Sequence, residues 1–141
     1  MKQLLTLAVF LVSFFVFSQK ERIDDLTVKL AYQTQDSLKV DMSLMLIDEI
    51  LAIKDYNKAL LYINQTAKLS ITLNYTKGLA ESTYYRALIY TVRNDYYNAI
   101  DNYEKSRKYY LQISDTLGIA KVSNSIGLIE IKRGNYAVGL K

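Results

Sequence analysis

The fold is decided by a stretch that occurs three times, and its middle copy reads Asp95-Tyr96-Tyr97-Asn98-Ala99-Ile100. Forty residues earlier the chain has Asp55-Tyr56 followed by Ala59-Leu60, and forty residues later it has Asn135-Tyr136 followed by Gly139-Leu140. A period of this length is typical of repeat proteins, in which each unit stacks on its neighbours and the units share a continuous core. The repeat therefore predicts a right-handed superhelical solenoid.

Within each unit, small and apolar side chains follow helical spacing. One such series steps by four, three, four and three residues through Ala99, Tyr103, Ser106, Tyr110 and Ile113, which places it on one face of an α-helix. Residues 93–95 and 133–135 are expected to form short turns, and residues 74–76 and 114–116 to cap the helices that follow. We therefore expect an all-α chain of helical hairpins, with helices at about 22–34, 38–53, 56–73, 77–93, 96–113 and 117–133 and a further start at Tyr136.

The first eighteen residues differ in composition from the rest of the chain. All four Phe lie between positions 10 and 17, whereas every later aromatic residue is Tyr. A basic Lys2, an apolar run from Leu4 to Phe17 and the small residue Ser18 are features of a secretory signal peptide. We therefore expect cleavage after Ser18 and an exported protein, periplasmic or extracellular, without a stable membrane span. Retention of residues 1–18 as a membrane anchor is the alternative.

The composition excludes several kinds of chemistry. The 141 residues include no Cys and no His, so thiol and imidazole nucleophiles and the usual zinc ligands are missing. Adjacent carboxylates such as Asp24-Asp25 point apart on a helix and do not form an acid–base pair. The basic residues Lys105, Arg107 and Lys108 lie late in a predicted helix, where the helix dipole favours cations. We therefore expect no enzyme activity, cofactor, metal or nucleic-acid ligand.

These units resemble tetratricopeptide repeats of the variety with a period near forty residues. The resemblance rests on small residues at helix crossings, a recurring turn and a bulky ring beside them: Ala87 and Gly127, residues 94–96 and 134–136, Ala99 and Gly139, and Tyr103. It implies repeats at about 37–76, 77–116 and 117–141, the last incomplete, after a partial helical unit at 19–36. In the first repeat, Ile47 replaces the small residue of the pattern.

Such repeats typically bind partners through a concave surface formed by the first helix of each unit, and the resemblance implies the same here. Helical spacing places nine side chains on that surface: Asp41, Leu44, Asp48, Glu81, Tyr84, Leu88, Lys121, Asn124 and Leu128. This mixed set suits a peptide with some apolar anchors, although several of its members alternatively pack between units. Among the thirteen Tyr, the freest to make surface contacts are Tyr62, Tyr75, Tyr85, Tyr97 and Tyr109.

The predicted function is a non-enzymatic scaffold for a protein or peptide partner. The resemblance also implies an alternative, because exported chains of this kind often place the repeats ahead of a membrane helix and a signalling module. The chain is then the N-terminal sensory or docking part of a larger envelope protein, such as a sensor kinase or transcriptional regulator. An enzyme whose catalytic residues lie outside this sequence and a purely structural spacer are two further alternatives.

Overall fold

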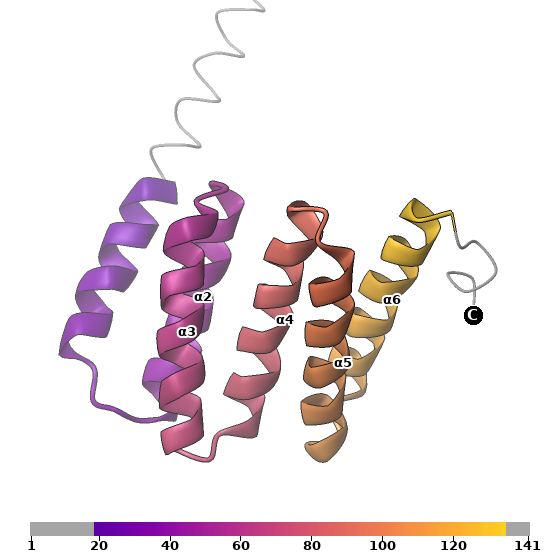
Figure 1. Cartoon of the computed structure of the whole chain (residues 1–141). Helices are drawn as coiled ribbons and strands as arrows, with labels where there is room; N and C mark the ends of the chain where they lie inside the picture. Colours follow the sequence, from indigo (N-terminus) through magenta and orange to yellow (C-terminus); the bar gives the residue numbers. More distant parts are fainter. Residues whose placement is uncertain (1–18, 135–141) are drawn as a thin grey trace, which may run out of the picture.

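The computed structural model describes residues 19–134. In that part of the chain, six helices follow one another in antiparallel order: 19–32, α2 (Ser37–Ala52), α3 (Tyr56–Thr72), α4 (Thr76–Val92), α5 (Tyr96–Gln112) and α6 (Thr116–Lys132) (Figure 1). No strand occurs among these residues. The ends of α2 to α6 differ from the expected ones by at most one residue, so the all-α fold of helical hairpins is confirmed.

Two expectations concern residues outside 19–134. They are the signal peptide at 1–18 and the helix start expected at Tyr136. Both remain predictions from the sequence. Across residues 19–134, none of the helices combines the length and the apolar character that crossing a membrane requires.

One kind of turn follows each helix from α2 to α6. A residue with positive φ stands in each of these turns: Lys54 at 61°, Asn74 at 50°, Asn94 at 59°, Ser114 at 55° and Gly134 at 79°. These positions are twenty residues apart. The structural module is therefore one helix with its turn, half as long as the forty-residue repeat of the sequence.

A pair of backbone hydrogen bonds closes each of the turns that follow α2 to α5. After α4, the Asn94 N–H donates to the Thr91 carbonyl at 3.1 Å, and the Asp95 N–H donates to the Tyr90 carbonyl at 3.0 Å. This is the Schellman arrangement, in which a left-handed residue lets the chain leave a helix while its last carbonyls stay hydrogen-bonded. Equivalent bonds follow α2, α3 and α5, so the same reversal of direction is repeated along the chain.

Most of the helices are capped by the side chain of the residue that precedes them. At the starts of α2, α3, α5 and α6, an aspartate carboxylate accepts a hydrogen bond from the backbone N–H three residues later. These aspartates are Asp36, Asp55, Asp95 and Asp115. Tyr75 stands in the same place before α4 and forms no side-chain cap. The expectation of a side-chain cap at 74–76 is therefore wrong, because Asn74 provides the positive φ of the turn instead.

Each helix packs part of its surface against the neighbouring helices. One cluster of buried side chains joins the helix at 19–32 with α2, α3 and Ile89 of α4, and a second joins α4, α5 and α6. The stripe expected on α5 is buried from Ala99 to Tyr110. Ile113 is an exception at 39% exposed, because α5 ends at Gln112 and the chain turns away.

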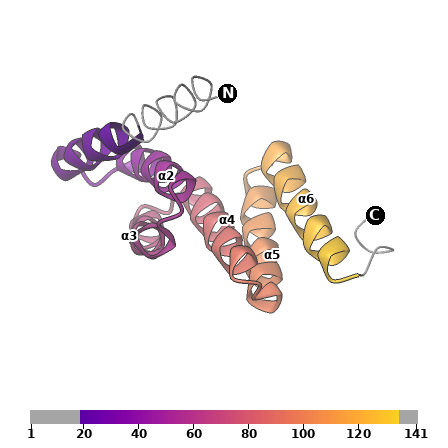
Figure 2. The ribbon, with the colours of Figure 1, turned by 90° about the horizontal axis from the view of Figure 1, so that it is seen from above.

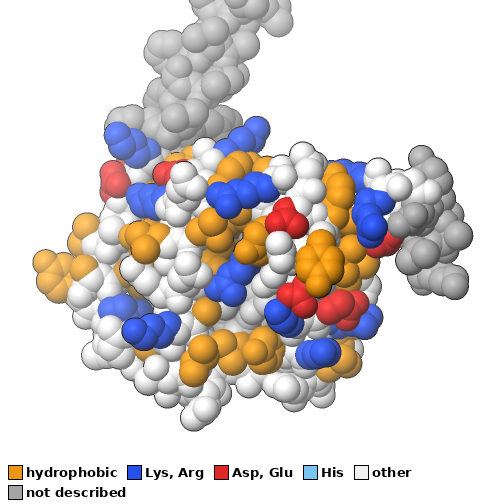
Figure 3. Space-filling view, in the orientation of Figure 1, with side chains coloured by type: hydrophobic (Ala, Val, Ile, Leu, Met, Phe, Trp, Pro, Cys, Tyr) orange, Lys and Arg blue, Asp and Glu red, His pale blue; other side chains and the backbone are white. Residues whose placement is uncertain are grey.

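The first helices of the units, α2, α4 and α6, follow one another along the array. Figure 2 looks down on this succession, with α3 set to one side between α2 and α4. On the face drawn in Figure 3, basic side chains are scattered among acidic and apolar ones. The charge on this face is therefore mixed rather than of one sign.

Two glycines allow consecutive helices to approach closely. A Cβ atom at Gly118 would overlap the ring of Tyr110, and one at Gly78 would overlap the side chains of Ser70 and Val40. Tyr110, Ser70 and Val40 are fully buried, so they have little space into which to move. The end of one unit and the start of the next therefore pack without room for a methyl group.

We predict that Gly118→Ala lowers the free energy of unfolding by about 1–3 kcal/mol, because the added methyl group overpacks the contact with Tyr110. The sign is informative, since alanine normally stabilises a helix relative to glycine by roughly 0.5–1 kcal/mol. Urea denaturation followed by circular dichroism measures the change. The control Ser123→Ala, at an exposed position of α6, should shift stability by less than about 0.5 kcal/mol. A Gly118→Ala protein as stable as the parent would contradict the close contact.

Candidate functional site

A groove of about 490 Å³ lies along the first helices of the three units. Its walls are Asp41, Leu44, Met45 and Asp48 of α2, Lys77, Glu81 and Tyr85 of α4, and Lys121 of α6. Five of the nine residues that the spacing placed on the concave surface lie here, namely Asp41, Leu44, Asp48, Glu81 and Lys121. We refer to this hollow as the groove.

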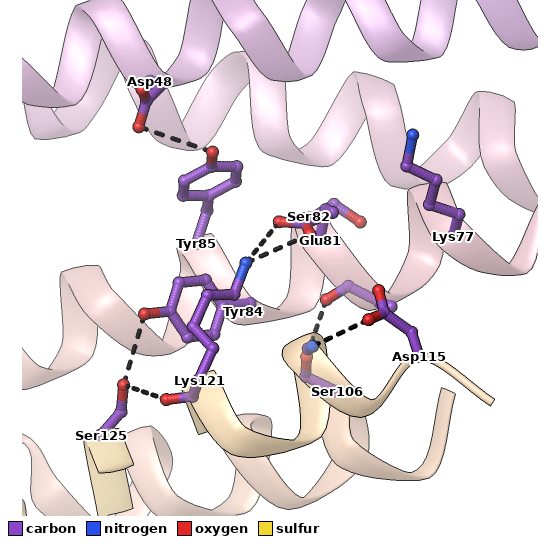
Figure 4. A network of polar contacts seen from close by, with 12 residues as sticks. Asp48, Lys77, Glu81, Ser82, Tyr84, Tyr85, Ser106, Asp115, Lys121 and Ser125 are labelled. Atoms are coloured by element: carbon purple, nitrogen blue, oxygen red, sulfur yellow. Dashed lines mark hydrogen bonds and ion pairs between the residues drawn. The ribbon is translucent and has the colours of Figure 1, made fainter. Parts of the chain in front are cut away.

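Two carboxylates of the groove pair with lysines from the next first helix. Asp41 on α2 accepts a hydrogen bond from Lys77 Nζ on α4 at 3.3 Å, and it also accepts one from the Tyr75 hydroxyl at 3.0 Å. Glu81 on α4 accepts from Lys121 Nζ on α6 at 2.9 Å (Figure 4). Each pair therefore connects one first helix to the next across the groove.

Lys121 also lies against aromatic rings. Its Nζ is 4.1 Å from the centroid of the Tyr84 ring and 5.5 Å from that of the Tyr110 ring. A cation at these distances is attracted by the negative face of the ring. The Tyr84 hydroxyl shares a hydrogen bond of 3.3 Å with Ser125 Oγ on α6. These contacts hold α4 against α6 along the groove.

Asp48 differs from the other two carboxylates of the groove. It is exposed, and across residues 19–134 it takes part in no salt bridge. The Tyr85 hydroxyl donates to Asp48 Oδ1 at 3.5 Å, which is at the limit of a hydrogen bond. Met45, one helical turn earlier on α2, is 54% exposed. The groove therefore offers one carboxylate without a cation beside one accessible apolar side chain.

The other four residues expected on the concave surface lie outside the groove. Tyr84 is only 9% exposed and belongs to the buried cluster between α4 and α5, where its ring centroid is 5.4 Å from that of Tyr103. Leu88 packs against the same cluster. Asn124 and Leu128 are exposed on α6, farther along that helix than Lys121. Tyr84 and Leu88 therefore pack between helices and do not line the groove.

Three residues of the groove were not among those expected from the sequence. Met45 lies four residues after Asp41, while Lys77 and Tyr85 lie four residues before and after Glu81. Side chains four residues apart share a helix face, so this spacing could have identified all three. For Tyr85 the sequence predicts a surface contact, and the structure places this residue in the groove.

Burial suppresses ionisation of several tyrosines around the groove. Desolvation raises the pKa of Tyr85, and the carboxylates of Asp48 and Glu81 raise it further. Desolvation also raises the pKa of Tyr110, again with help from the nearby Glu81 carboxylate. None of the resolved shifts in the described part of the chain moves a pKa toward neutrality. The Tyr85 and Tyr110 hydroxyls therefore keep their protons at neutral pH.

Two further hollows are less suited to a shared partner site. One of about 470 Å³ lies between the helix at 19–32, α2 and α3, and one of about 700 Å³ lies between the start of α5 and the end of α6. Neither is lined by all three first helices. Over residues 19–134, no group of three or more acidic, Cys or His side chains is placed to hold a metal ion.

We predict that Tyr110→Phe raises the free energy of unfolding at pH 7 by as much as about 1–2 kcal/mol. The Tyr110 hydroxyl is buried and makes no hydrogen bond of good geometry among the described residues, although the Glu81 carboxylate lies nearby, and phenylalanine keeps the ring while removing that group. The control Tyr75→Phe removes a hydrogen bond to Asp41 and should lower stability by about 0.5–1.5 kcal/mol. Urea denaturation distinguishes the two variants, and a destabilised Tyr110→Phe protein would show that the hydroxyl has a partner.

The same variant should change the alkaline limb of the stability profile. A tyrosine whose folded pKa is raised binds its proton more tightly in the native state, so stability falls as pH rises above the unfolded pKa of about 10. Tyr110→Phe removes one such group, and its loss of stability between pH 9 and about 11 should therefore be smaller than that of the parent. Denaturation midpoints across this range measure the difference, and parallel profiles would contradict the shift.

Comparisons with known proteins found no match, whether against protein-family models, curated proteins or solved structures. The arrangement of the groove is therefore the basis for the function proposed below.

Proposed function

We propose that this chain is a non-enzymatic scaffold that binds a protein or peptide partner in the groove formed by its tetratricopeptide-like repeats. The observation that carries the proposal is the position of Asp41, Glu81 and Lys121, which are forty residues apart and line one hollow. A repeat array presents corresponding positions of successive units on one surface. An extended ligand that follows this surface meets a side chain from each unit.

The tetratricopeptide assignment is supported by the packing of the small residues in its pattern. Ala87 of α4 and Ala99 of α5 are both fully buried in one cluster, and the Tyr103 ring lies in the same cluster. Small side chains at a crossing let two helices approach, while a large ring fills the space beside them. With the repeated turn, this packing favours a stack that winds into a right-handed superhelix.

The groove favours binding over catalysis and over a purely structural spacer. The full sequence offers no Cys or His for nucleophilic chemistry. Met45 is accessible, and Asp48 is exposed with only a long contact of 3.5 Å from the Tyr85 hydroxyl. Side chains of this kind are suited to contact a partner.

We also propose that the scaffold acts outside the inner membrane, in the periplasm or the extracellular space. The support is the composition of residues 1–18, in which a basic start, an apolar run and a small residue at the end follow one another. The intact mass of the exported product tests this: a product that begins at Gln19 supports it, and one that retains Met1 to Ser18 contradicts cleavage.

We predict that peptides selected from a random display library against the purified protein bind in the groove. Met45→Gln should weaken their binding about fivefold or more, because an apolar contact of roughly 1 kcal/mol is lost. The matched control is Leu61→Gln on α3, since Leu61 is 56% exposed against 54% for Met45 and lies outside the groove. Fluorescence anisotropy of labelled peptides measures both affinities. Equal losses in the two variants, or a selection that yields no peptide, would contradict the proposal.

A further inference from the structure

The charges of the groove do not balance. It contains three carboxylates, on Asp41, Asp48 and Glu81, against two ammonium groups, on Lys77 and Lys121, which leaves a net charge of −1. The whole chain, in contrast, has a formal charge of +4. The groove is therefore an acidic site on a basic protein, and the excess charge is that of Asp48.

The two lysines are poor sites for an incoming anion, because each already has a carboxylate partner. Lys77 Nζ lies 3.3 Å from Asp41 Oδ1, and Lys121 Nζ lies 2.9 Å from Glu81 Oε2. Lys121 is held further by the Tyr84 ring, 4.1 Å from Nζ to the centroid. An anionic ligand would have to compete with these contacts and would also meet the charge of Asp48.

An incoming cation has a carboxylate available. The contact of 3.5 Å between the Tyr85 hydroxyl and Asp48 Oδ1 is long, so little is lost when a ligand replaces it. A hydrogen bond from an ammonium or guanidinium group to a carboxylate is roughly twice as strong as one between neutral groups. Lys or Arg therefore gains more at Asp48 than the Tyr85 hydroxyl loses.

The surroundings of Asp48 fit the rest of such a side chain. Figure 4 shows Asp48 and Tyr85 pointing toward each other from α2 and α4. The half-buried Tyr85 ring provides an aromatic surface for the aliphatic stem of Lys or for a guanidinium plane. Met45 lies three residues before Asp48 and so on the same side of α2. A cationic site and an apolar site thus stand next to each other.

We infer that the groove selects a segment of another polypeptide in which a Lys or Arg side chain lies beside an apolar one. The cationic group pairs with Asp48 next to the Tyr85 ring, and the apolar side chain covers Met45. This inference rests on the proposed function and names the chemistry of its partner.

The test uses peptides selected without bias from a random display library against the folded parent protein. The expected consensus carries Lys or Arg next to an apolar residue, and Asp48→Asn should weaken binding of these peptides about tenfold. High salt should raise Kd for the parent protein and change it less for the variant, which lacks the charge. Asp24→Asn is the matched control, because Asp24 is likewise exposed and without a salt bridge among the described residues but lies outside the groove. It should leave affinity unchanged, and circular dichroism confirms that both variants fold.

The outcomes separate this inference from the proposed function. Two results would overturn the inference and leave the scaffold function intact. In both, Met45→Gln weakens binding of the selected peptides, but either the peptides carry no basic residue or Asp48→Asn leaves their affinity unchanged. If neither substitution changes the affinity of the peptides, or if the selection yields no peptide, both the inference and the proposed function are contradicted. A dimer of this chain in sedimentation equilibrium that dissociates with Asp48→Asn would also overturn the inference, because a second copy would then occupy the groove.

Discussion

A left-handed residue after each helix from α2 to α6 is the constraint on which the rest of the structure depends. Lys54 and Ser114 adopt this conformation although they are neither glycine nor asparagine, at a cost of roughly 1–2 kcal/mol each. Two backbone hydrogen bonds close each of their turns, and the carboxylates of Asp55 and Asp115 cap the helices that follow. The turn thereby satisfies the end of one helix and the start of the next, and it reverses the chain at a fixed interval of twenty residues.

The fixed interval explains how the groove acquires its side chains. Two turns return the chain to its original direction, so residues about forty apart lie on neighbouring first helices and face the same side. The contacts across the groove follow this rule: Lys77 pairs with Asp41, Lys121 pairs with Glu81, and the Tyr84 hydroxyl bonds to Ser125. Because these contacts pair two of the three carboxylates of the groove, Asp48 is without a salt bridge among the described residues, and Met45 beside it is exposed.

Much of this architecture could be predicted from the sequence, because helix positions depend on local spacing and on short turn motifs. The twenty-residue module is harder to recognise, since the two helices of a unit bury different side chains and share only the turn and, at the starts of α2, α3, α5 and α6, an Asp cap. Helical spacing also could not predict which side chains of a helix are buried and which face the groove. Tyr84 lies on a first helix as expected, yet α4 packs against both α3 and α5 and buries most of its circumference, including this ring. The strip that remains for the groove is Lys77, Glu81 and Tyr85, of which only Glu81 was expected.

The most direct test of the repeated turn is measurement of φ at residues 54, 74, 94 and 114 by nuclear magnetic resonance. Scalar couplings and backbone chemical shifts of the labelled protein report this angle at each residue. The account predicts positive φ at all four, including Lys54 and Ser114, where the left-handed conformation is least favourable. Negative φ at Lys54 or Ser114 would contradict the twenty-residue module and, with it, the alignment of the helices that form the groove.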